Sequence, residues 1–254
     1  MQTLLRGPER KREVTRRLDA VEFVRGKLGF SPDATQEMVL RGGRRGIVNC
    51  TRQWGKSTVT AAKAVHRAYT EAESLTLALS PSGRQSGEFL RKAEEFVRRL
   101  GIRVRGDGAN EMSIELPNRS RIVGLPGNEV TGRGFSSVSL MLVDEAARVP
   151  DVMYRAMRPS LAARDGDLWL MSTPNGRQGF FWEEWDRGEG WERICVAAPD
   201  CPRIAARFLE EERARGDQWY RQEYLCEFLD REGAVFPREL IEAAFGEEFP
   251  GLDL

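Results

Sequence analysis

The chain is poor in the residues that make metal centres and histidine-based catalytic sites. It has one histidine, His66, and four cysteines, none of them in the CxxC spacing of a zinc site. A serine or cysteine nucleophile would have a single candidate base, and His66 falls in an expected helix where we interpret it as a packing or surface residue. These shortages argue against a zinc protein and a histidine-dependent hydrolase. We interpret the cysteines as reduced, intracellular thiols.

Long apolar runs and an excess of charge of one sign are also missing. No stretch approaches the roughly 18 apolar residues of a membrane span, and the N-terminus lacks the apolar core of a signal peptide. Lys plus Arg and Asp plus Glu number 39 each, so no global basic signature points to nucleic acid. With 254 residues, 41% of them hydrophobic, we expect a globular protein with a sizeable core.

The chain is organised around the stretch CTRQWGKST, Cys50 to Thr58. It follows an apolar run at 46–49 that predicts a strand and precedes a predicted helix at 59–69. Strand, tight loop, Gly-Lys-Ser and helix is the layout of a phosphate-binding P-loop. Cys50 departs from the general pattern GxxxxGK[ST], because it stands where the first glycine is expected.

The P-loop layout assigns a role to each part of this stretch. Loop amides and a helix N-terminus favour an anion, and Gly55 lets the backbone approach it closely. Lys56 would reach the β- and γ-phosphates of ATP, and the Ser57 hydroxyl would bind Mg²⁺. The residues expected to bind ATP here are Thr51, Arg52, Gln53, Trp54, Gly55, Lys56, Ser57 and Thr58.

Apolar runs and helical periodicity alternate through the rest of the chain. Strands are predicted at 75–80, 139–143 and 168–172, with shorter ones at 103–105, 112–116 and 121–123. Helices are predicted at 12–28, 34–40 (capped by Ser31 or Asp33), 89–100, 152–163 and 205–229. Continuous apolar strands that alternate with helices indicate an α/β fold with a mostly parallel sheet covered on both faces. Ligands bind at the carboxyl ends of such strands, where the polar clusters at 50–58, 144–145 and 172–176 all fall.

The run LMLVDEA, Leu140 to Ala146, supplies carboxylates at one of these strand ends. Asp144 is expected to join Ser57 around Mg²⁺, and Glu145 to polarise a water for attack on the γ-phosphate. Two adjacent carboxylates would be costly to bury without a cation. An ordinary strand-end turn with solvated acids is the alternative, but the P-loop favours an NTPase site.

Three motifs in this order, TRQWGKS, LVDEA and STPNG, resemble the ATPase domain of the large terminase subunit of tailed bacteriophages. The resemblance covers roughly residues 25–235, and the Arg-Gln variant without the first glycine is typical of that family. It implies a P-loop NTPase of the additional-strand type that hydrolyses ATP with Mg²⁺. The implied function is a motor that packages double-stranded DNA into the procapsid.

The resemblance also implies roles for residues outside the P-loop. Gln36, in a segment similar to an adenine-reading Q motif, would contact the base, the alternative being an exposed helix glutamine. Ser172, Thr173 and Asn175 would couple the γ-phosphate to DNA movement, the alternative being a strand-to-helix turn. In the Gly-rich loop at 127–135, Arg133 would be an arginine finger that acts on a neighbouring subunit. Arg52 and Arg148 remain alternatives for that arginine.

By the same resemblance we expect an ATPase core at 1–195, a lid or linker subdomain at 196–235, and a linker at 236–254. The last segment would lead to a missing nuclease domain, with Asp253 as its first metal-binding acid, so this fragment should lack nuclease activity. The implied partners are double-stranded DNA, the portal protein, the small terminase subunit and further copies in a ring. Assembly would take place in the host cytoplasm, without a membrane. A helicase-like translocase and an ATP-binding docking module without turnover are the rival hypotheses.

Overall fold

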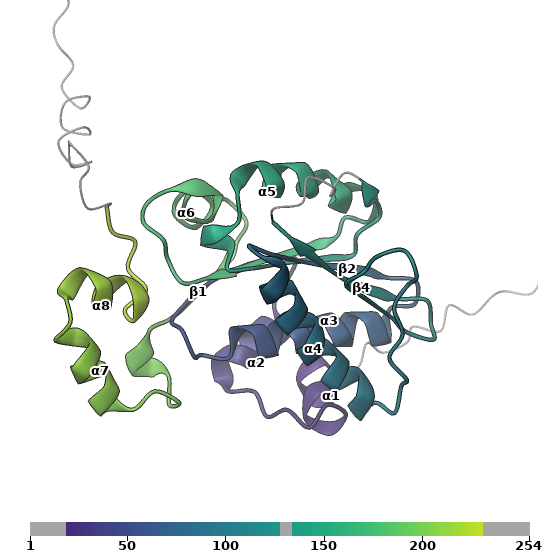
Figure 1. The fold of residues 1–254 in the computed structure, drawn as a ribbon, viewed down its shortest axis with the longest axis horizontal. Coiled ribbons are helices and arrows are strands. Elements are labelled where there is room, and N and C mark those ends of the chain that lie inside the picture. The colour runs from purple at the N-terminus through teal and green to yellow at the C-terminus, as the bar shows by residue number, and fades with distance from the viewer. Residues whose placement is uncertain (1–18, 128–133, 231–254) are drawn as a thin grey trace, which may run out of the picture.

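The computed structural model of the chain describes residues 19–127 and 134–230, and its centre is one seven-stranded sheet (Figure 1). The strand order is β3-β4-β2-β5-β6-β1-β7, and all neighbours run parallel except β3 and β4. The strands are β1 (Arg45–Cys50), β2 (Leu75–Ser80), β3 (Ser113–Glu115), β4 (Arg121–Pro126), β5 (Leu140–Asp144), β6 (Asp167–Ser172) and β7 (Glu192–Val196). The predicted α/β fold with a mostly parallel sheet is confirmed.

Helices cover both faces of the sheet, as Figure 1 shows. On one face lie α1 (Ala20–Gly26), α2 (Ala34–Arg41), α3 (Lys56–Thr70) and α4 (Gly83–Arg99), and on the other α5 (Asp151–Met157) and α6 (Gly179–Asp186). Alternate side chains of each strand point to opposite faces, so Leu142 packs in the first core and Met141 in the second. Both cores are apolar, which explains why the central strands are continuous apolar runs.

The position of β6 brings the predicted site together. It lies between β1, which leads into the P-loop, and β5, which ends in Asp144. Asn49 of β1 is in register with Ser172, and Asp144 with Met171, so the carboxyl ends of all three strands meet at one edge. A strand inserted between these two is the feature that defines the additional-strand type of P-loop NTPase.

A small helical unit follows β7. It contains α7 (Ala206–Arg213) and α8 (Asp217–Glu223), and its apolar contacts form a core of its own around Leu209, Tyr220 and Tyr224. The prediction of one continuous helix at 205–229 is wrong. Gly216 breaks it with a φ of 152°, and Cys226, at a φ of 60°, lies in the non-helical segment after α8.

Two further local predictions are corrected. The segment 103–105 is not a strand; Arg105 accepts a backbone hydrogen bond from Glu115 of β3 at 2.8 Å, and a single bond does not make a ladder. The predicted helix at 152–163 divides into α5 and the 3₁₀ helix η3 (Arg158–Arg164), because Pro159 lacks the amide hydrogen that would continue α5. Two 3₁₀ turns, η2 (Ala146–Arg148) and η4 (Ala198–Asp200), complete the described elements.

Of the other predictions, β2 at 75–80 and α2 after its cap match closely. The helix predicted at 12–28 is wrong in its start, because α1 begins at Ala20 after its N-cap Asp19, and the helix predicted at 89–100 begins earlier, at Gly83, after its N-cap Ser82. Of the two candidate caps of α2, Asp33 is the one found, in a capping box with Gln36. No helix within the described ranges is long and apolar enough to cross a membrane. The predictions for Arg133, for Asp253 and for the segment 236–254 lie outside the described residues.

Candidate active site

The P-loop is a tight turn between β1 and α3, and Gly55 is the residue that allows it. Its φ of 95° is left-handed, and a Cβ there would lie 2.9 Å from Nε2 of Gln36. As the N-cap of α3, Gly55 leaves the helix start without a side-chain cap, so amide hydrogens there are available to an anion. Cys50 is the last residue of β1 and its φ is not positive, so the backbone at that place does not require glycine.

Gln36, on α2, stabilises the P-loop through a hydrogen bond to its backbone. Its Nε2 donates to the carbonyl of Trp54 at 3.0 Å, and its Oε1 accepts from the amide of Asp33 at 3.1 Å. The guanidinium of Arg203 donates to both Trp54 O (2.9 Å) and Gln36 Oε1 (3.3 Å). Gln36 is 1% exposed, so the alternative of an exposed helix glutamine is wrong. One hydrogen of its amide is left over, and its adenine contact stays a prediction.

Residues of the P-loop and of the β5 end meet directly. The Lys56 ammonium donates to Glu145 Oε1 at 2.5 Å and lies 3.6 Å from Asp144 Oδ1. The Ser57 hydroxyl donates to Asp144 Oδ2 at 3.3 Å. The backbone of Glu145 is left-handed, at a φ of 51°, a conformation that a non-glycine residue adopts at a cost of about 1–2 kcal/mol. This strained turn aims the Glu145 carboxylate back at the P-loop.

Burial and charge set the protonation states at this contact. Burial by itself lowers the pKa of the Lys56 ammonium, but the carboxylates of Asp144 and Glu145 outweigh it and hold the pKa above its ordinary value. Burial by itself raises the pKa of Glu145, but Lys56 outweighs it and the pKa is lowered. Both groups are therefore charged near pH 7. Burial raises the pKa of the Cys50 thiol to about 12, so that thiol is neutral.

The donor set of Ser57 and Asp144 suits Mg²⁺. Magnesium prefers hard oxygen ligands and is commonly held by one or two carboxylates, the substrate's phosphates and water. A hydroxyl and a carboxylate 3.3 Å apart at the mouth of a P-loop fit that description. Within residues 19–127 and 134–230, no cluster of three or more His, Cys, Asp or Glu side chains that could hold a metal ion occurs.

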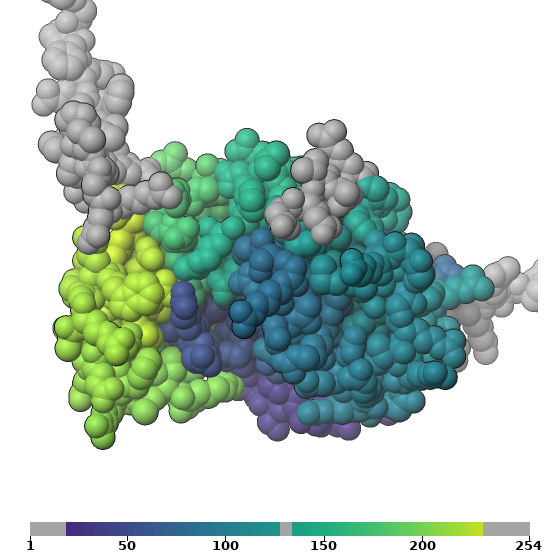
Figure 2. Space-filling view, viewed as in Figure 1, coloured from purple at the N-terminus to yellow at the C-terminus, as the bar shows by residue number. Residues whose placement is uncertain are grey.

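A cavity of about 480 Å³ opens over these residues. Figure 2 shows the surface near the P-loop, in blue, between the green-yellow α7–α8 unit and the teal main body. Two residues of α4, Gln85 and Lys92, also line it, although neither belongs to a recognisable sequence motif. They are seven positions apart, which places them on one face of the helix. The full lining is Thr51, Arg52, Gln53, Gly55, Lys56, Ser57, Thr58, Gln85, Lys92, Glu145 and Arg148.

The loop after β6 contacts both neighbouring strand ends. The Thr173 hydroxyl donates to the carbonyl of Cys50 at 3.0 Å, and Asn175 Nδ2 donates to the carbonyl of Ala147 at 3.4 Å. The Ser172 hydroxyl donates to the Thr173 carbonyl at 2.7 Å and is fully buried. This loop is a strand-to-helix connection, and it also touches the P-loop strand and the turn beyond Glu145. Its coupling role stays a prediction.

The two described candidates for the trans-acting arginine are engaged within their own chain. Arg52 Nε donates to Glu223 Oε2 at 2.6 Å. Arg148 donates to Glu223 Oε1 and to Glu145 Oε2, both at 3.3 Å. Glu223, on α8, is a site neighbour that sequence reasoning missed, because it lies 171 positions from Arg52.

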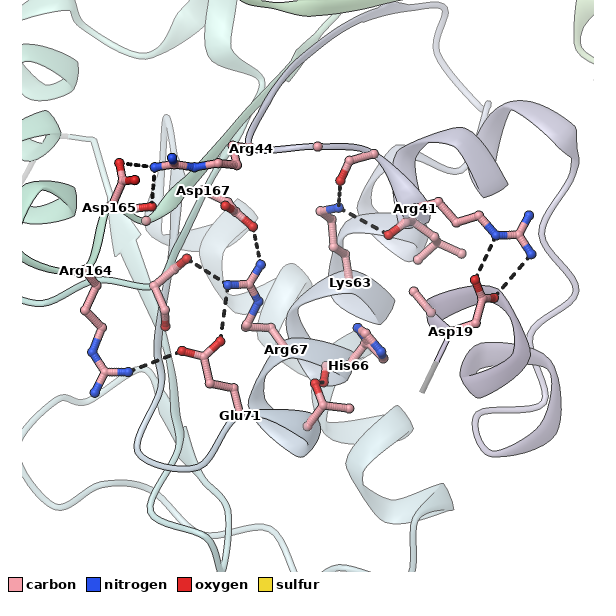
Figure 3. A pocket seen from close by; sticks show the side chains of 17 residues that line it. Asp19, Arg41, Arg44, Lys63, His66, Arg67, Glu71, Arg164, Asp165 and Asp167 are labelled. Atoms are coloured by element: carbon pink, nitrogen blue, oxygen red, sulfur yellow. Dashed lines mark hydrogen bonds and ion pairs between the residues drawn. The ribbon is translucent and has the colours of Figure 1, made fainter. Parts of the chain in front are cut away.

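A larger cavity, about 860 Å³, lies at the opposite edge of the sheet (Figure 3). The amino ends of β1 and β6 and the C-terminal half of α3 line it, away from the strand ends where ligands of parallel sheets bind. Its arginines are paired with its carboxylates: Arg41 with Asp19 at 2.9 Å, Arg164 with Glu71 at 3.3 Å, Arg67 with Asp167, and Arg44 with Asp165. This pairing makes it a structural ion-pair network, and the smaller cavity remains the candidate site.

Comparisons with known sequences agree with the motifs. The family described as "Terminase large subunit, T4likevirus-type, N-terminal" matches residues 47–243. The chain is 26% identical over 250 residues to the terminase large subunit of Thermus virus P23-45, in an alignment that covers 82% of this chain and 51% of that protein. The chain spans about half the length of the curated relatives it matches.

Solved structures share the fold. The large terminase ATPase domain of Thermus phage P74-26 superposes with a TM-score of 0.72 at 22% identity, covering 84% of this chain and 100% of that one. The large terminase of a thermophilic bacteriophage, in complex with ATP-gamma-S, gives a TM-score of 0.59 at 15% identity, covering 85% and 52%. At these identities the likeness concerns the fold alone.

Proposed function

The chain belongs to the family of phage terminase large subunits, whose N-terminal part its residues 47–243 match, and from this premise we propose that it is the ATPase motor domain for DNA packaging. The observation that carries the proposal is the meeting of Lys56 and Ser57 with Glu145 and Asp144 at one sheet edge. These groups match a phosphate-binding cation, two oxygen ligands for Mg²⁺ and a base. The ATP-gamma-S complex of the thermophilic bacteriophage terminase supports a nucleotide as the ligand.

In the proposed reaction, Lys56 and the amides at the start of α3 hold the β- and γ-phosphates. Ser57 and Asp144 would hold Mg²⁺, which neutralises charge on the triphosphate. Entry of the phosphates draws the Lys56 ammonium away from Glu145 and frees that carboxylate. Glu145 then accepts a proton from the water that attacks the γ-phosphorus, and the bond to ADP breaks to give ADP and phosphate.

The loop at 172–176 and the helices beside the site would transmit the conformational change that accompanies ATP hydrolysis. Ser172, Thr173 and Asn175 lie between the P-loop strand and the turn after Glu145, a position suited to sensing the γ-phosphate. We propose residues 1–195 as the ATPase core and 196–235 as a lid, which the separate small core of α7 and α8 supports. Double-stranded DNA, the portal protein, the small terminase subunit and further copies of the chain are the proposed partners.

Phosphate release from ATP tests the proposal. The chain should release phosphate with Mg²⁺ and stop when EDTA is added. Lys56→Ala should weaken ATP binding, which titration with a fluorescent ATP analogue measures, whereas Lys27→Ala, at an exposed position, should bind as the parent does. Binding without any turnover would favour the rival function, an ATP-binding docking module. Mg²⁺-independent turnover would contradict the proposed site.

A further inference from the structure

Glu223, the last residue of α8, is a buried acid beside the candidate nucleotide cavity. Its side chain is 2% exposed, yet it carries the carboxylate that binds both Arg52 and Arg148. Both arginines line the cavity. A buried carboxylate is tolerated only where cations compensate it. Glu223 and the two cavity arginines therefore form one ion-pair unit that joins α8 to the site.

Two more residues of α8 face the same region. Arg52 also lies over the Trp219 ring, with the guanidinium 6.0 Å from the ring centroid. Gln222 accepts a hydrogen bond from the amide of Gly176, in the loop after β6, at 3.2 Å. Helix α8 therefore contacts three parts of the site: Arg52 of the P-loop, Arg148 and the loop at 172–176.

The end of α8 and the segment after it are hydrogen-bonded to β1 and to the first residue of the P-loop. Asn49 Nδ2 donates to the Cys226 carbonyl at 2.7 Å, and the Thr51 hydroxyl donates to the Glu223 carbonyl at 3.1 Å, both in buried positions. The start of α8 follows Gly216, whose φ of 152° is open to few other residues. The segment 223–226 can therefore serve as a pivot about which the rest of α8 turns.

We propose that Glu223 is a positioning residue that competes with the nucleotide phosphates for Arg52 and Arg148, and so transmits phosphate occupancy to α8. The inference rests on the proposed function. Phosphates offer guanidinium groups a more highly charged partner with matching bidentate geometry. When the arginines turn to the phosphates, Glu223 loses the charges that compensate its burial, and α8 is held less firmly. Because linkage is reciprocal, Glu223 weakens phosphate binding by the same factor.

Hydrogen exchange of the unaltered chain tests the transmission. With Mg²⁺ and AMP-PNP, amides of α8 (217–223) should exchange faster than in the free chain, whereas adenosine, which lacks phosphates, should leave their exchange unchanged. Exchange that stays the same or slows with bound AMP-PNP would overturn the inference. A titration in the same samples reports binding separately, so failure to bind AMP-PNP would instead count against the proposed function.

Glu223→Gln tests the competition, because glutamine keeps the size and one acceptor but removes the charge. The variant should bind AMP-PNP about 5-fold or more tightly, lower the KM for ATP without a rise in kcat, and lose the nucleotide response of α8. Glu227→Gln is the matched control in the same segment, since Glu227 pairs with Arg221 at 2.6 Å and is 38% exposed. It should bind and respond as the parent does.

Unchanged or weaker binding by folded Glu223→Gln, or an α8 response equal to that of the parent, would overturn the competition. If the substitution prevents folding, the exchange comparison on the unaltered chain decides alone, with the same two outcomes.

Discussion

The carboxylate of Glu145 lies 2.5 Å from the ammonium of Lys56, although 89 positions separate the two residues. In this arrangement the two charges neutralise each other, so nucleotide phosphates would have to draw the Lys56 ammonium away from the Glu145 carboxylate. Glu145 is thus held ionised and close to the γ-phosphate position, as a general base requires. Its removal should therefore affect turnover and leave nucleotide binding in place.

Glu145→Gln should abolish turnover while nucleotide still binds. Glutamine keeps the shape but accepts no proton from water, so ATP hydrolysis should fall by ~10²-fold or more. Phosphate release and titration with a fluorescent ATP analogue measure the two effects separately. Glu111→Gln, at an exposed position, is the control and should hydrolyse as the parent does. Equal turnover in Glu145→Gln and the parent would remove Glu145 from the mechanism.

Gly55→Ala should weaken nucleotide binding and destabilise the fold. The left-handed φ of 95° costs a residue with a Cβ about 1–2 kcal/mol, and that Cβ would press on Gln36. The melting temperature should fall, and the rise in melting temperature that ATP brings should shrink. Gly83→Ala is a matched control, since its Cβ would meet nothing within 4 Å. A parent-like melting curve for Gly55→Ala would show that the loop accepts another backbone conformation.

Arg133→Ala should still bind ATP. If Arg133 acts on a neighbouring subunit, the substitution should lower the turnover rate by ~10³-fold or more. Arg52 and Arg148 are both engaged by Glu223 of their own chain, which leaves Arg133 as the favoured trans-acting candidate. Mixing Arg133→Ala with Lys56→Ala should restore part of the turnover, because a complete P-loop and a complete arginine then meet across a boundary.

The dependence of turnover on protein concentration is a second test of whether Arg133 acts on a neighbouring subunit. Activity per chain should rise with protein concentration if neighbours complete the site. A mixture that stays inactive, together with turnover per chain that is independent of concentration, would return the role to Arg52 or Arg148.

We predict that the buried ammonium of Lys63 makes the stability of the fold depend on pH. Its ammonium is buried against the Trp169 ring and donates to the Val39 carbonyl at 2.8 Å, and burial lowers its pKa from 10.5 to about 8. Between these values the unfolded chain binds more protons than the folded one, so stability should rise with pH. The gain, relative to Lys63→Met, should reach about 3 kcal/mol at most.

Urea unfolding at several pH values between about 7 and 10.5 measures this difference. Lys27→Met, at an exposed position, should show no such change relative to the parent. A constant difference between the parent and Lys63→Met across this range would mean that the folded pKa of Lys63 is not lowered.

Neighbouring residues in the chain specify the local elements that carry the chemistry. An apolar run, a Gly-Lys-Ser turn and a helical pattern predict β1, the P-loop and α3, because each is decided by neighbours within a few positions. The apolar runs ending in Asp144 and Ser172 predict β5 and β6 for the same reason. Periodicity also indicated the two-sided parallel sheet, since only a strand buried on both faces can be apolar throughout.

Contacts between distant residues set how these elements meet. The place of β6 between β1 and β5, the hydrogen bond from Gln36 to the Trp54 carbonyl and the ion pairs of Glu223 all join residues far apart in the chain. Helical and strand periodicity describe which side of an element is apolar, but not which other element it packs against. Glu223 therefore looked like one more charge in a helical, charged segment, until the fold buried it between two arginines of the site.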